Sequence, residues 1–201
     1  MIIRKEENRD YYDVENLIRE AFWNVYRPGC FEHYLVHKLR DNIVFVKELD
    51  YVIEEDNKIV ASIFYAKGMI IGIDNVNYEA LLFGPVGVLP EYQKKGYGEK
   101  LINYTMDRAR ELGYNYILIT GNPDYYKKYG FVKASDYGIF YDGMEGDTPF
   151  FMIKVLNNNC DIPKGIYKDP ECYLNINEEE LAEYDKNFSY KVKEKMDGQL
   201  L

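Results

Sequence analysis

Two lysines and two glycines lie close together in the segment Gln93-Lys94-Lys95-Gly96-Tyr97-Gly98, directly before an amphipathic stretch that predicts a long helix. The first amides of a helix have no acceptor inside the helix, and they lie at the positive end of its dipole. Glycines let such amides approach a phosphate closely, and the two lysines add positive charge. The segment is therefore typical of an anion site, and a diphosphate suits it.

Two diphosphate motifs do not fit this segment. A dinucleotide fingerprint needs a third glycine, whereas Gly98 is followed by Glu99, Lys100 and Leu101. A Walker A loop needs Gly-Lys followed by Ser or Thr, and this segment has no such run. By spacing alone, a plain capped helix without a ligand stays open as an alternative, and so does a nucleotide as the diphosphate.

Strand and helix patterns surround the segment. Apolar residues at helical spacing predict a helix from Asp13, taken as the N-cap, to Phe22, and further helices over about Phe31–Arg40 and Gly98–Leu112. Pro123–Tyr129 predicts a short helix that Gly130 stops. Short apolar runs predict strands at Ile2–Lys5, Ile43–Leu49, Tyr51–Glu55, Ile59–Ala66, Ala80–Val88, Tyr116–Thr120 and Phe150–Leu156. This order predicts a mixed α+β domain with a central sheet.

Glycines and turn residues divide the predicted strands. Asp56-Asn57-Lys58 has turn chemistry, and Gly68 and Gly72 are expected to punctuate the chain after the strand at 59–66. Gly84-Pro85 and Gly87 lie inside the apolar run at 80–88, so a bulge is expected there instead of a regular ladder.

The residues on both sides of the anion segment extend the pattern. From Val86 the chain reads V-x-V-x-P-x-x-Q-x-x-G-x-G, which resembles the acetyl-CoA signature of the GNAT superfamily of N-acetyltransferases. Tyr125-Tyr126-Lys127-Lys128-Tyr129-Gly130-Phe131 is similar to the family's F-Y-x-x-x-G-F element, and Ile2 to Phe22 resembles the family's start. The resemblance covers about residues 1–156.

The resemblance implies an α+β fold with a GNAT-like central mixed, mostly antiparallel sheet, a bulged strand and flanking helices. Residues 1–156 would form the acetyltransferase domain. Residues 157–201 would form a C-terminal extension that packs on this domain, with a charged helical stretch near Glu178 to Tyr184.

The resemblance also implies how acetyl-CoA would bind. Backbone groups near Val86 and Val88 would hydrogen-bond the pantetheine arm, and the bulge would make room for it. The amides from Lys94 to Glu99 would hold the pyrophosphate. The predicted coenzyme residues are Val86, Gly87, Val88, Gln93, Lys94, Lys95, Gly96, Tyr97, Gly98 and Glu99.

Tyr126 has a catalytic role under the resemblance, in which it would protonate the departing CoA thiolate. Many members have an Asn seven residues before this Tyr, whereas this chain has Ile119 there and Asn122 four residues before it. Without a catalytic role, Tyr126 would be a packing aromatic beside Phe131.

The amine acceptor must lose a proton, because an amine of pKa about 10.4 is almost fully protonated at neutral pH. A carboxylate is the expected proton acceptor, directly or through water. Glu79, at the head of the bulged strand, is the predicted base, and Glu32 is the alternative. Both residues could equally be solvated surface acids.

Composition limits the partners. The net charge of -9 argues against nucleic acid and is compatible with a cationic amine. His33 and His37 have metal-ligand spacing but no third ligand, so no metal is expected. Three cysteines without a C-x-x-C pair favour free thiols in a reducing cytoplasm, and no apolar run is long enough to span a membrane.

The sequence thus predicts an acetyl-CoA-dependent N-acetyltransferase that acts on a primary amine of a small molecule or peptide. A non-catalytic acyl-CoA-binding or regulatory module is the alternative. The oligomeric state is open, and a homodimer is among the possibilities.

Overall fold

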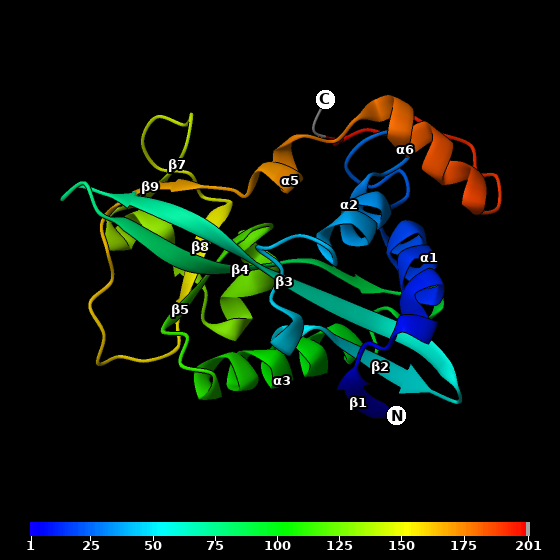
Figure 1. Ribbon diagram of the computed structural model, residues 1–201, viewed down its shortest axis with the longest axis horizontal. Helices are drawn as coiled ribbons and strands as arrows, with labels where there is room; N and C mark the ends of the chain where they lie inside the picture. The colour runs from blue at the N-terminus through cyan, green and yellow to red at the C-terminus, as the bar shows by residue number, and fades with distance from the viewer. Residues whose placement is uncertain (200–201) are drawn as a thin grey trace. The chain divides into compact units, whose positions relative to one another are not determined.

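A computed structural model describes residues 1–199, which form two compact units along one continuous chain (Figure 1). Unit 1 contains Met1–Phe64, Pro85–Ile102 and the chain from Glu171 onward, and unit 2 contains Tyr65–Gly84 and Asn103–Pro170. Three elements run from one unit into the other: β3 (Lys58–Gly72), β4 (Asn77–Val88) and α3 (Tyr97–Glu111).

Unit 1 combines three antiparallel strands with two packed helices. Strand β2 (Tyr51–Glu55) pairs with β1 (Ile2–Lys5) and with the first half of β3. Asp56 and Asn57 have φ angles of 51° and 62°, as a two-residue hairpin turn requires, so the predicted turn is confirmed. Helices α1 (Tyr11–Phe22) and α2 (Glu32–Leu39) pack against each other (Figure 1).

The end of the chain attaches to these helices within unit 1. It contains α5 (Glu171–Leu174) and α6 (Glu178–Tyr184), so the predicted helical stretch is confirmed. Asp185 accepts a hydrogen bond of 3.0 Å from the Arg19 side chain, which is only 2% exposed. Burial opposes ionisation of Asp185, yet His33, whose Nε2 lies 3.2 Å away, and Arg19 lower the pKa of its carboxyl to about 2. A buried charge network therefore fixes this segment on α1 and α2.

Unit 2 contains the remaining strands: β5 (Tyr116–Thr120), β6 (Val132–Lys133), β7 (Ile139–Tyr141), β8 (Phe151–Val155) and β9 (Gly165–Lys168). Strand β8 pairs antiparallel with β5 and β6, whereas β5 pairs parallel with β4. Strand β9 pairs antiparallel with β3 and parallel with β7 (Figure 1). The short α4 (Pro123–Tyr126) follows β5. The predicted mixed, mostly antiparallel sheet with flanking helices is confirmed.

The C-terminal extension predicted from residue 157 contributes to both units. It supplies β9 to unit 2 and α5 and α6 to unit 1.

Three local predictions are wrong. Ile43–Leu49 is not a strand, because the Asn42 side chain accepts a hydrogen bond from the Val44 amide at 3.1 Å and starts a turn. Asp13 is not the N-cap of α1, because Asp10 takes that position after a short 3-10 turn. Gly68 does not interrupt β3. It lets β9 approach, because a Cβ there would lie 2.4 Å from the Tyr167 hydroxyl.

Candidate functional site

The last residues of β4 lie directly against α1 in unit 1. A Cβ at Gly87 would meet Ile18 Cδ1 at 2.7 Å and Leu17 Cδ2 at 3.0 Å, and both side chains are fully buried. Only glycine leaves room for this contact, so the strand end that carries the predicted pantetheine contacts packs tightly on the helix. The Leu89 amide then donates to the Val60 carbonyl at 3.0 Å and keeps the chain on β3.

The loop after this strand has an irregular and exposed backbone. The Gln93 side chain donates from Nε2 to the Val88 carbonyl at 3.1 Å and ties the loop to the end of β4. Lys94 and Gly96 have φ angles of 59° and 87°, in the left-handed region. Few side-chain-bearing residues of this protein adopt that region, and Lys94 is one of them. The backbone therefore turns sharply both before and after Lys95.

Aromatic contacts hold the base of this loop. The rings of Tyr92 and Tyr97 meet edge to face, with centroids 5.6 Å apart, and Lys95 Nζ lies 5.4 Å from the Tyr92 centroid. The Tyr97 hydroxyl donates to the Glu55 carboxylate. The loop is thus anchored on unit 1 while the side chains of Lys94 and Lys95 stay exposed.

Helix α3 begins at the end of this loop. The Lys100 amide donates to the Gly96 carbonyl at 3.0 Å, so the amides of Tyr97 and Gly98 belong to the first turn, where a helix offers no acceptor. A Cβ at Gly96 would meet nothing within 4 Å, which leaves open space beside these amides. The loop therefore combines open space, helix-start amides and two lysines, and this combination suits the pyrophosphate of a coenzyme.

Tyr126, at the end of α4 in unit 2, is held by aromatic neighbours. Its ring centroid lies 5.8 Å from those of Phe83 and Phe131. A Cβ at Gly121 would lie 2.5 Å from Tyr126 Cε2, so this glycine makes room for the ring. Phe83 and Gly121 are positioning residues that the sequence reasoning missed. The Gly121-Asn122-Pro123 break after β5 was the available signal.

Asn122 has a structural role. Its side chain accepts a hydrogen bond from the Asp124 amide at 2.9 Å and caps α4.

Strand β4 is irregular where the sequence predicts a bulge. The β4–β5 ladder joins Leu81 to Ile117 and Leu82 to Leu118. Two residues later, Gly84 has a φ of 146°, which side-chain-bearing residues rarely adopt. This conformation departs from regular strand geometry close to Phe83, the residue that contacts Tyr126.

The two candidate bases have different environments. Glu79 forms an ion pair of 3.1 Å with Lys67, and its side chain is 55% exposed. Glu79 lies four positions before Phe83, about 13 Å along the strand, and Phe83 is the residue that contacts Tyr126. Glu32, at the start of α2, accepts a hydrogen bond from the Phe31 amide at 3.0 Å, and burial raises the pKa of its carboxyl to about 7.

The two histidines on α2 face different partners. His33 Nδ1 lies 3.4 Å from Cys30 Sγ, whereas His37 Nδ1 lies 3.1 Å from a carboxylate oxygen of Glu15. Within residues 1–199, no group of three His, Cys, Asp or Glu side chains is placed to hold a metal ion. In the same range, no helix is both long and apolar enough to cross a membrane.

Comparison with known proteins identifies the fold. Residues 46–133 match the model of the acetyltransferase (GNAT) domain. A GNAT family acetyltransferase from Brucella melitensis, solved with acetyl-CoA, is 24% identical with a TM-score of 0.67, over 86% of this chain and 97% of the other. The GNAT family N-acetyltransferase YhbS from Escherichia coli, solved with CoA, is 20% identical with a TM-score of 0.73, over 88% and 93%.

A more distant enzyme has the same fold. The ribosomal-protein-S18-alanine N-acetyltransferase from Escherichia coli is 13% identical with a TM-score of 0.54, over 79% of this chain and 97% of the other. No curated protein matches by sequence. The family model thus places an acetyltransferase (GNAT) domain at residues 46–133, and the solved structures show that most of the chain has the GNAT fold.

Proposed function

We propose that this protein binds acetyl-CoA along Val86–Val88 and at the Lys94–Glu99 loop, and transfers the acetyl group directly to a primary amine of a small molecule or peptide. The loop geometry carries this proposal: Lys94 and Gly96 lie in the left-handed region directly before the first turn of α3, the side chains of Lys94 and Lys95 are exposed, and a Cβ at Gly96 would meet nothing within 4 Å. The two GNAT structures solved with acetyl-CoA and with CoA support the choice of ligand.

The transfer requires two proton movements. The neutral amine attacks the thioester carbonyl, a C–N bond forms, the C–S bond breaks and the thiolate leaves. In the proposal, Tyr126 gives its hydroxyl proton to this thiolate, and a carboxylate takes the proton that the amine loses. No metal is needed for either step.

The test of the Tyr126 role is Tyr126→Phe. The phenyl ring keeps the packing on Phe83, Phe131 and Gly121, so acetyl-CoA affinity and melting temperature should change little. Turnover should fall by at least about tenfold, since general acids contribute on the order of 10² to 10⁴. Tyr125→Phe, one residue earlier and 42% exposed, is the matched control. Equal turnover in wild type and Tyr126→Phe would remove the assigned role.

The pH profile distinguishes the two candidate bases. If Glu32 is the base, kcat/KM should rise with pH around its pKa of about 7, and Glu32→Gln should abolish this limb. If Glu79 is the base, Glu79→Gln should lower the rate, and Glu32→Gln should not. A profile that neither variant changes would exclude both carboxylates.

A panel of amines, scored by release of free CoA, would identify the acceptor class. Calorimetric titration with acetyl-CoA, CoA and nucleotides tests the coenzyme, and a preference for nucleotides would overturn the proposal. Tight CoA binding without turnover on any amine would favour a non-catalytic acyl-CoA-binding module.

The proposal extends to location and assembly. Within residues 1–199, Cys30, Cys160 and Cys172 form no disulfide, which supports a reducing, cytoplasmic setting. A homodimer is testable by light scattering.

A further inference from the structure

A cavity lies in unit 2, at the N-terminal end of β4. Its volume is about 270 Å³, slightly below the range of about 300–1,000 Å³ that is usual for drug-sized ligands. The lining consists of Tyr78, Glu79, Leu81, Gly113, Tyr114, Asn115, Tyr116, Asp161 and Pro163. Among the described residues, this lining includes three tyrosines, Glu79 and Asp161, and no lysine or arginine. The cavity is therefore aromatic and acidic.

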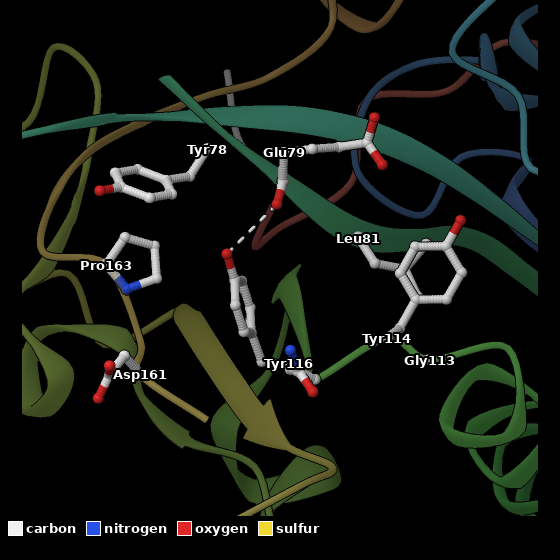
Figure 2. A pocket seen from close by; sticks show the side chains of 9 residues that line it. Tyr78, Glu79, Leu81, Gly113, Tyr114, Tyr116, Asp161 and Pro163 are labelled. Carbon is white, nitrogen blue, oxygen red and sulfur yellow. Dashed lines mark hydrogen bonds between the residues drawn. The ribbon is translucent and has the colours of Figure 1, made fainter. Parts of the chain in front are cut away.

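Two of the rings are held in place by hydrogen bonds. The Tyr116 hydroxyl donates to the Glu79 carbonyl at 3.3 Å, as the dashed line in Figure 2 shows. Burial raises the pKa of Tyr116 to about 12, so its phenol is neutral at physiological pH. The Tyr78 hydroxyl donates to Asp74 at 2.5 Å, and Gly72 makes room for the ring, since a Cβ there would meet Tyr78 Cε2 at 2.8 Å. The cavity walls are thus formed before a ligand arrives.

The two carboxylates differ in orientation. The Glu79 carboxylate is paired with Lys67, and in Figure 2 it points away from Tyr78, Pro163 and Asp161. Asp161 lies on the same side of the Tyr116 ring as Tyr78 and Pro163 (Figure 2). Within the described residues, no basic side chain pairs with Asp161. Asp161 is therefore the negative charge that this cavity offers to a ligand.

We propose that this cavity binds a small organic ammonium ion, with its positive charge over the Tyr78 and Tyr116 rings and beside Asp161. An aromatic face attracts a cation electrostatically, and a nearby carboxylate adds to this attraction. About 13 Å of strand separates Glu79 from Phe83, which contacts Tyr126, so this site is separate from the proposed site of acetyl transfer.

The test is titration of the full chain with choline at low salt, followed by amide chemical shifts. Choline has a quaternary nitrogen that cannot be N-acetylated, so binding cannot reflect use as an amine acceptor in the proposed reaction. We expect saturable shifts at residues 113–116 and 161, with a dissociation constant on the order of millimolar for about seven contacting non-hydrogen atoms. This result is independent of acetyl-CoA binding and turnover, so it can fail while the proposed function holds.

The neutral isostere 3,3-dimethyl-1-butanol measures the contribution of the charge. It should bind at least about fivefold more weakly than choline, because it keeps the shape and loses the cation–π attraction. Equal affinity for the two ligands would overturn the proposal, and so would choline shifts confined to other residues.

Two variants test the named groups. Asp161→Asn, at an exposed position, should weaken choline binding by about two- to fivefold and leave the affinity for the isostere unchanged. Asp136 is another exposed carboxylate of unit 2, so Asp136→Asn is the matched control and should change the affinity for neither ligand. Tyr78→Leu should weaken choline binding by about fivefold or more, because it removes an aromatic face from the cavity. Unaltered choline binding in both Asp161→Asn and Tyr78→Leu would refute the site.

Discussion

Gly87→Ala tests whether the coenzyme strand depends on close packing against α1. The added Cβ would lie 2.7 Å from Ile18 Cδ1 and 3.0 Å from Leu17 Cδ2. Both neighbours are terminal methyls, but their side chains are 0% and 1% exposed, so they have little space to move away. Overpacking of this kind costs about 1–3 kcal/mol.

The expected result is a loss of about 2 kcal/mol in the free energy of unfolding, measured by urea denaturation. For a chain of this size, that loss lowers the melting temperature by about 4–8 °C. Acetyl-CoA affinity should fall as well, because the strand that would hold the pantetheine arm moves away from the helix.

A double-mutant cycle shows whether the cause is steric. Ile18→Val removes the methyl that the new Cβ would meet and costs about 0.5–1.5 kcal/mol by itself. In the Gly87→Ala background the same change should cost less or even stabilise, giving a favourable coupling energy. Additive effects of the two substitutions, or an unchanged urea midpoint in Gly87→Ala, would refute the packing explanation.

Two further predictions concern charge. Lys95→Ala should weaken acetyl-CoA binding by up to about fivefold at low salt, and less at high salt, because Lys95 is an exposed cation. Calorimetry would measure this affinity, with Lys47→Ala as the control. A loss of affinity that does not depend on salt would contradict the prediction. Burial and the neighbouring Glu6 carboxylate raise the pKa of Asp50 well above the usual aspartate range. The folded state thus keeps a proton that the unfolded chain releases, and stability should decline as pH rises above about 4. Asp50→Asn should flatten this decline in urea unfolding from about pH 5 to 9, and an equal slope in both proteins would contradict the assignment.

The loop before α3, the proposed coenzyme segment, was largely predictable from sequence as a helix start, because the preferences that form it are local. The signals are the glycine spacing, the adjacent lysines and the following amphipathic pattern, and each can be read from neighbouring residues. They therefore predict a helix start suited to an anion. The turn at Asp56-Asn57 and the helix at Glu178–Tyr184 are confirmed for the same reason: turn and helix preferences are local.

Errors arose where distant residues decide the conformation. Gly68 has the appearance of a strand end, but it lies inside β3 because Tyr167, about a hundred residues later, passes over it. The apolar run at 43–49 has strand composition, yet the capping side chain of Asn42 starts a turn instead.

Sequence by itself determined which groups are available: a glycine-rich helix start with two lysines, a tyrosine after a strand, and an acidic chain rich in aromatics. Only the tertiary structure decided which of them meet. It packs Gly87 on α1, fits the Tyr126 ring over Gly121, and gathers Tyr78, Tyr116 and Asp161 around one cavity. The physical reason is that such contacts join residues far apart in the chain, and their geometry depends on strand register and side-chain packing, which no short sequence pattern encodes.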